Sequence, residues 1–289
     1  MHRNNFGYGG GSKVNVAKDL YNDKKYNIKI DSDSGSGSGS DGGIGVEERN
    51  KNIVFFKLLS RLELWVGFTT NKEYNSAFFY VKDDFCSLRD FLKRNEERYG
   101  YGNGYNETSV GGCLSYDEAV FMVDSLCQQI MLFSGSGSSW GFYCFLLDNV
   151  YVVDNHKFIY LGIEHLIEVR SGEKTINFTI PFPEKMMIMR GGGDIMKLFI
   201  CPEIKNMNQL PVKVLYSSTY YHLASLIIYC MFHKNLCFGG VGGVGGVGGG
   251  DDDDDVDGGI LSAIVNTKLY WFLIRCLHKD PSKRILLWI

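Results

Sequence analysis

Hydrophobic and polar positions change their period along the chain, and these changes predict where strands give way to helices. Apolar residues that alternate with polar ones favour strands, and apolar residues that recur at helical spacing favour helices. The predicted strands are 13–18, 26–30, 64–69, 77–81, and a hairpin of 150–153 with 158–161. The predicted helices are 52–59, 87–95, 115–133, 218–232 and 267–277. This order predicts an α+β chain with a sheet-rich front and a helical back.

The segment 115–133 carries the clearest helix signal. Ser115 stands where an N-cap is preferred, and Glu118 completes a capping box. The apolar residues that follow share one helix face: Ala119, Val123, Leu126, Cys127 and Ile130. Because that face is continuous, we expect a helix packed against the core.

Low-complexity segments rich in glycine, serine and aspartate interrupt these elements. They cover 31–45, 97–113, 134–139 and 239–259. Such composition buries almost no apolar surface, so we expect flexible insertions in surface loops. The segments between them are too short to fold alone, which predicts a single domain over 1–289.

Composition narrows the class of protein. Hydrophobic residues make up 45% of 289 residues and the net charge is -3, which permits a sizeable core and gives no sign of a nucleic-acid surface. Eight cysteines without a CxxC pair predict free thiols in a reducing compartment. No signal peptide is evident, and the longest apolar run, 220–232, is too short to span a membrane. These features predict a cytoplasmic or otherwise intracellular protein.

A cluster of glycines near the N-terminus is the first candidate for chemistry. Closely spaced glycines let a backbone approach phosphates, and a strand lysine can add a positive charge. The residues of this motif are Gly7, Gly9, Ser12, Val14, Ala17 and Lys29. The same residues are also compatible with a flexible tail followed by a strand with an exposed lysine. Alone they do not distinguish this structure from a phosphate-binding loop.

An ordered set of segments resembles the protein kinases over nearly the whole chain. The glycine cluster resembles their glycine-rich loop, with Lys29 in the place of the strand lysine. The segments that resemble the later kinase elements are 52–68, 77–95, 115–133, 148–153, 201–203 and 280–284. The stretch 87–95 is also similar to kinases that act on a translation initiation factor. The resemblance implies a bilobal fold with an N-lobe over 1–84 and a C-lobe over 85–289.

The resemblance also implies which residues would hold ATP and metal. ATP would lie on Gly7, Gly9, Ser12, Val14, Ala17 and Lys29, and Asn149 would be the Mg²⁺ ligand. Glu203, in the place of the Ala-Pro-Glu glutamate, would form a buried ion pair with Arg284. Asp280 and Pro281 would begin a helix. These last features hold a fold together and perform no chemistry.

The positions that carry phosphoryl transfer depart from the kinase pattern. Counting back from Asn149 places Cys144 where the catalytic aspartate accepts a proton, and places Leu146 where the loop lysine is usual. Counting forward places the metal-binding Asp-Phe-Gly motif near 161–164, where Glu164 is the only carboxylate.

Two further positions depart from the pattern. The position of the helix glutamate that pairs with the strand lysine in kinases falls on Asn52, with Glu48 one turn earlier as a substitute. The position of the helix aspartate that organises the catalytic loop in kinases falls on Thr219. The chain is therefore identified as a degenerate kinase, a pseudokinase, with no intact catalytic residue.

Three functions fit this pattern to different degrees. The leading one is a pseudokinase that binds a protein partner, another kinase or its substrate, with at most weak ATP binding. The second is a divergent active Ser/Thr kinase with Glu164 or Asp148 as the metal ligand. The third is a non-enzymatic scaffold whose acidic loop, Asp251–Asp255, binds basic partners or divalent cations. Neither a nucleic acid nor a membrane is an expected partner.

Overall fold

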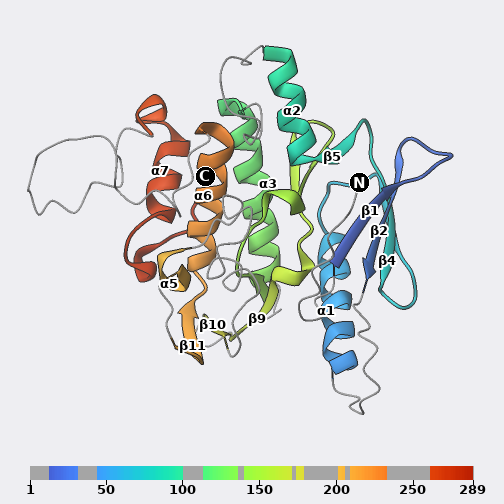
Figure 1. The fold of residues 1–289 in the computed structure, drawn as a ribbon, viewed down its shortest axis with the longest axis horizontal. Helices are drawn as coiled ribbons and strands as arrows, with labels where there is room; N and C mark the ends of the chain where they lie inside the picture. Colours follow the sequence, from blue (N-terminus) through green and yellow to red (C-terminus); the bar gives the residue numbers. More distant parts are fainter. Residues whose placement is uncertain are drawn as a thin grey trace, which may run out of the picture.

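The computed structural model describes residues 13–31, 44–99, 113–135, 140–170, 174–178, 201–205, 209–232 and 261–288. Three glycine-loop residues, Gly7, Gly9 and Ser12, lie outside these ranges, as does nearly all of the four predicted insertions. The described residues form a mixed α+β fold, as predicted. Figure 1 shows the sheet that holds β1, β2 and β4 on one side, α6 and α7 on the other, and α3 between them.

The strands and helices alternate irregularly along the chain. The strands are β1 (Lys13–Lys18), β2 (Lys25–Asp31), β3 (Gly67–Thr70), β4 (Ser76–Tyr80), β5 (Phe85–Ser87), β6 (Trp140–Phe142), β7 (Val150–Val153), β8 (Lys157–Tyr160), β9 (Leu166–Arg170), β10 (Thr175–Phe178) and β11 (Val212–Leu215). The helices are α1 (Ile44–Leu59), α2 (Leu88–Tyr99), α3 (Tyr116–Gly135), α5 (Pro202–Lys205), α6 (Ser218–Phe232) and α7 (Lys268–Cys276). Short 3₁₀ turns include η1 (Leu147–Asn149), η2 (Ile163–His165), η5 (Ser262–Ile264) and η6 (Pro281–Lys283).

The first sheet is antiparallel and has the order β1-β2-β4-β3. Because side chains alternate along a strand, Tyr26, Ile28 and Ile30 share the face that turns to the core. Tyr26 is opposite Phe79 in the ladder, and their rings stack with centroids 5.5 Å apart. Helix α1 packs on this same face, since Phe56 meets Phe68, the ladder partner of Phe79.

Two other sheets contain the strands that follow. One has the order β5-β7-β8, and the other has the order β11-β10-β9-β6. The back was predicted to be mainly helical, and it also contains β11, which follows α5 and forms one edge of a four-stranded sheet. The five strands β5, β6, β9, β10 and β11 have three to five residues each, too few to give a clear alternating pattern.

Two long helices form the centre of the molecule. Helix α3 lies beside α6 (Figure 1). It also contacts β8 and β6, and its apolar face is buried as its spacing predicts. The capping box is also confirmed: Ser115 N–H donates to Glu118 Oε2 at 2.8 Å, and Glu118 N–H donates to Ser115 Oγ at 3.3 Å. Helix α6 is buried over nearly its whole length, as expected of a helix that carries the longest apolar run of the sequence.

Several other predictions from the sequence are confirmed, with shifted ends. The hairpin of 150–153 with 158–161 forms as β7 and β8. The helix predicted over 52–59 begins at Ile44. The seven described cysteines are free thiols, and five of them are buried. Within the described ranges no helix is long and apolar enough to cross a membrane.

The turn between β7 and β8 links two sequence-distant parts of the chain. Asp154 and Asn155 have φ of 51° and 62°, a left-handed conformation that Asp and Asn tolerate well. The Asp154 carboxylate accepts hydrogen bonds from the backbone N–H groups of Asp83, at 2.7 Å, and Asp84, at 3.3 Å. The hairpin is thereby fastened to the segment that leads into β5.

We expect the change Asp154→Ala to reduce the free energy of unfolding by about 1–2 kcal/mol, because it removes an acceptor and strains a left-handed residue. The change Asp154→Asn keeps an oxygen acceptor and the backbone preference, so it should cost less than half as much. Urea unfolding of both variants checks this expectation. Equal losses in the two variants would contradict it.

Candidate functional site

The residues expected to hold a nucleotide lie on two different faces of the first sheet. Val14 is opposite Ile30 in the ladder and packs on the core side. Ala17 is opposite Asn27, on the other side, where Lys29 is also exposed. The structure therefore does not bring Val14 together with Ala17 and Lys29.

The position expected for the helix glutamate also lies away from Lys29. Asn52 is buried within α1, and its Oδ1 atom has no hydrogen-bond partner. Helix α1 packs on the core face of the sheet, whereas Lys29 is on the opposite face. Glu48 belongs to the first half of α1. Lys29 and Asn52 are therefore not placed to act on one ligand.

The loop that carries Cys144 and Asn149 lies beside the segment 160–165. Strand β6 leads into this loop and pairs with β9, so that Phe142 is opposite Leu166. Tyr143 N–H donates to the carbonyl of His165 at 3.1 Å. Cys144 is a buried free thiol between Tyr143 and Phe145, which are buried as well. A buried thiol is a poor proton acceptor, because desolvation disfavours the thiolate.

Asn149 and Glu164 are brought together, although fifteen positions separate them in sequence. The Asn149 amide Nδ2 donates to Glu164 Oε1 at 2.5 Å, and Leu161 N–H donates to the Asn149 carbonyl at 2.8 Å. The second oxygen, Glu164 Oε2, is buried without a hydrogen-bond partner. Asn149 is thus held by the segment 161–164 through both its side chain and its backbone carbonyl.

Asp148, the other carboxylate considered as a metal ligand, forms an ion pair with Arg89. Its Oδ1 accepts hydrogen bonds from Arg89 Nη2 at 2.6 Å and Arg89 Nε at 3.0 Å. Both side chains are partly exposed. Among the described residues, no group of three or more His, Cys, Asp or Glu side chains is gathered in a way that could hold a metal ion.

Tyr160 lies at the centre of this loop region, and its role was not predicted. Its hydroxyl accepts a hydrogen bond from Leu146 N–H at 3.2 Å and lies 2.6 Å from His165 Nδ1. Its ring is fully buried between Phe142 and Phe145, with centroids 4.9 Å and 4.7 Å away. Burial raises the pKa of Tyr160 well above its usual value, so the hydroxyl stays protonated.

Thr219, where an aspartate of the kinase pattern falls, also contacts this region. It is buried at the start of α6, and its hydroxyl donates to the Phe142 carbonyl at 2.5 Å. Helix α6 is in this way tied to the strand that leads into the Cys144 loop. A neutral hydroxyl anchors the backbone here without adding charge to the loop.

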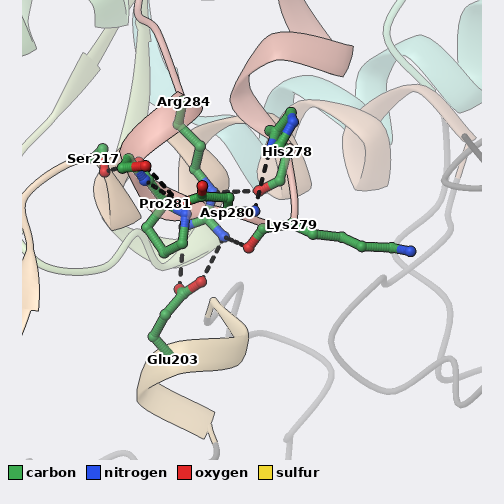
Figure 2. A network of polar contacts seen from close by, with 8 residues as sticks. Glu203, Ser217, His278, Lys279, Asp280, Pro281 and Arg284 are labelled. Carbon is green, nitrogen blue, oxygen red and sulfur yellow. Dashed lines mark hydrogen bonds and ion pairs between the residues drawn. The ribbon is translucent and has the colours of Figure 1, made fainter. Parts of the chain in front are cut away.

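The predicted pair of Glu203 and Arg284 is confirmed (Figure 2). Arg284 Nη2 lies 2.6 Å from Glu203 Oε1, and Arg284 Nη1 lies 3.1 Å from Glu203 Oε2, which is a bidentate geometry. Arg284 Nε also donates to the His278 carbonyl at 2.8 Å, and its guanidinium lies over the Tyr221 ring at 4.9 Å. Asp280 caps η6 and Pro281 is its first residue, as predicted.

A buried histidine lies near this network. His222 in α6 is completely buried, and burial, aided by the positive charge of Arg284, lowers the pKa of His222 to about 3. The folded state therefore keeps His222 neutral, whereas the unfolded chain protonates it near the ordinary value of about 6.5. Stability that depends on the neutral ring is lost as the pH falls below that value.

We expect the free energy of unfolding to drop by about 2 kcal/mol between about pH 7 and about pH 5 through this one residue. The change His222→Leu should remove that part of the pH dependence, whereas the same change at the exposed His156 should leave it. Urea unfolding across this pH range makes the comparison. A His222→Leu variant with the full pH slope would contradict the assignment.

No protein-family model matches the chain, and no curated protein matches it. The site is therefore interpreted from its own geometry. Sequence patterns located Asn149, Glu164 and Cys144, but not the bonds of Tyr160. The alternation of apolar and polar residues along a strand predicts that the Tyr160 ring is buried. It does not predict which distant backbone group forms a hydrogen bond with the Tyr160 hydroxyl.

Proposed function

We propose that this chain is a pseudokinase: a domain with a bilobal kinase-like fold that transfers no phosphate and acts by binding another protein. The order of elements supports this proposal, because two strands, a helix, three further strands and the twelve-residue helix α2 precede the long α3. The bidentate pair of Glu203 with Arg284 supports it as well, since the resemblance implies a pair at these positions.

The observation that carries the proposal is the state of the loop 144–149. The buried thiol of Cys144 stands at the position expected for the proton acceptor, and the amide of Asn149 is bonded to Glu164. Phosphoryl transfer needs carboxylates that position the hydroxyl and hold Mg²⁺, because positioning and charge neutralisation supply most of the rate. The chain has Cys144 where a carboxylate would position the hydroxyl, and Glu164 is the only carboxylate near the position expected to hold Mg²⁺.

Nucleotide binding under this proposal is weak. Lys29 is exposed on the face of the sheet opposite α1, so it contributes little to a site on the core face. A protein partner, such as another kinase or a kinase substrate, is the class of ligand that remains.

Glu164 favours one alternative, a divergent active Ser/Thr kinase. Its carboxylate lies against Asn149, and together they could supply oxygen ligands to Mg²⁺. The remaining alternative, an acidic scaffold loop at Asp251–Asp255, lies outside the described residues.

Transfer of labelled γ-phosphate from ATP to the chain itself or to a generic basic protein tests the proposal. We expect no transfer above that of a heat-denatured sample, and no difference between the wild-type chain and the Glu164→Gln variant. Transfer that the wild-type chain performs and the Glu164→Gln variant does not would establish the divergent active kinase instead.

A further inference from the structure

The end of β8 contains a tyrosine where the kinase pattern has a metal-binding aspartate. Gly162 follows Tyr160 by two positions, so that Tyr160-Leu161-Gly162 takes the place of Asp-Phe-Gly once the glycines are matched. Counting along the sequence from Asn149 places this motif near 161–164, and matching the glycines places it one residue earlier, at 160–162. In active kinases, the aspartate of this motif and the asparagine of the catalytic loop hold Mg²⁺ ions, and so the metal joins the two segments.

Direct protein contacts join the same two segments in this chain. The Tyr160 hydroxyl bonds to Leu146 N–H on one side and lies 2.6 Å from His165 Nδ1 on the other. The Asn149 amide also lies beside this hydroxyl and favours its ionised form slightly, although burial dominates and raises the pKa. The bond from Asn149 to Glu164 is a second link between the segments.

Gly162 provides independent support for this close contact. A Cβ atom at this position would lie 2.5 Å from the Tyr160 hydroxyl oxygen and 2.8 Å from Asn149 Nδ2. Such distances are too short for any side chain, so the turn can close over Tyr160 and Asn149 only with glycine there.

The backbone of Tyr160 is fixed by a buried glutamine. Gln129 Nε2 in α3 donates to the Tyr160 carbonyl at 2.7 Å, and Tyr160 N–H donates to Gln129 Oε1 at 2.9 Å. Both polar groups of the Gln129 amide are therefore used, and both backbone groups of Tyr160 are satisfied. This pair of bonds sets the position from which the tyrosine ring extends towards the loop.

We propose that Tyr160 is a positioning residue that substitutes for a bridging metal: its hydroxyl clasps the loop 144–149 to the turn 162–165, so that this region keeps its shape without a divalent cation. The comparison with kinases rests on the proposed function, whereas the clasp itself rests on the contacts of Tyr160. It follows that the Leu146 amide is protected from solvent exchange by the tyrosine and not by Mg²⁺.

Hydrogen exchange of single backbone amides, followed by NMR, tests this proposal. In the wild-type chain we expect the Leu146 amide to exchange at the same slow rate in Mg²⁺ and in EDTA. The change Tyr160→Phe keeps the ring but removes the acceptor, and we expect exchange at Leu146 to accelerate about tenfold or more. The matched control is Tyr151→Phe in β7, a half-buried tyrosine that stacks on Phe85, and it should leave Leu146 unchanged.

Two results would overturn the clasp. One is slow exchange at Leu146 in the wild-type chain only when Mg²⁺ is present, a comparison that needs no variant. The other is unchanged exchange at Leu146 in the Tyr160→Phe variant. Phosphate transfer by a chain whose Leu146 protection is independent of metal would overturn the proposed function and support the clasp.

Discussion

The change Arg284→Ala should destabilise the protein more than any other single substitution considered for this chain, by about 3–5 kcal/mol. Arg284 is almost fully buried, and its removal leaves the half-buried Glu203 carboxylate without its partner. The variant also loses the bond to the His278 carbonyl and the contact with the Tyr221 ring. A denaturant series on both proteins measures the effect.

The matched control is Arg275→Ala, an exposed arginine of α7. This substitution should change the free energy of unfolding by less than about 0.5 kcal/mol. A second variant, Arg284→Lys, keeps the charge but cannot form the bidentate pair, so its stability should fall between those of wild type and Arg284→Ala. If Arg284→Ala cost no more than Arg275→Ala, the pair would not be holding α5 to the C-terminal segment.

The same pair predicts how stability responds to acid. Burial by itself raises the pKa of Glu203, but the hydrogen bonds from Arg284 and Cys201 and the positive charge of Arg284 together outweigh it, and the pKa in the folded state is lowered. A carboxyl with a lowered pKa stabilises the fold above its unfolded pKa, and this stabilisation is lost as the pH falls through the folded pKa. The Arg284→Ala variant should lack that acid-dependent loss.

The change Gly162→Ala should have the second largest effect, a loss of about 3 kcal/mol. The added methyl group would lie within 2.6 Å of both the hydroxyl oxygen and Cζ of Tyr160. Tyr160 cannot move away easily, because its ring is enclosed by Phe142 and Phe145 and its backbone is bonded to Gln129. Thermal or urea unfolding measures the loss.

Gly67→Ala is the control for this prediction. A Cβ atom at Gly67 would lie 3.6 Å from Tyr80 Cδ2, an ordinary van der Waals contact. That variant should therefore differ from wild type by less than about 1 kcal/mol. Similar stabilities for the Gly162→Ala and Gly67→Ala variants would show that the turn at Gly162 has room for a side chain.

The sequence predicted best the elements whose signals are local. The capping box of Ser115 with Glu118 and the hairpin at Asp154 depend on residues close together in the chain, and both form as expected. The Glu203–Arg284 pair spans eighty-one positions, and it was predicted only because a resemblance supplied the pairing.

Features that depend on sheet registration could be predicted only in part. A single-residue difference in strand parity decides whether Lys29 faces the core or solvent, and the sequence around it, with Ile28 and Ile30 on either side, favours the outward position. The short strands β6 and β9 are specified by pairing with each other rather than by their own patterns. The bonds of Tyr160 arise only after both strands are in place.

We propose that the site around Asn149 and Glu164 has no working metal centre, and thermal unfolding with ATP tests this proposal most directly. The melting temperature would be compared without nucleotide, with ATP and Mg²⁺, and with ATP and EDTA. A ligand at 100 times its dissociation constant stabilises a folded protein by about 2.7 kcal/mol, which raises the melting temperature by a few degrees. We predict that the melting temperature with ATP is the same in Mg²⁺ and in EDTA. A shift that requires Mg²⁺ would contradict this proposal, because it would show that the folded chain binds a metal-bound nucleotide.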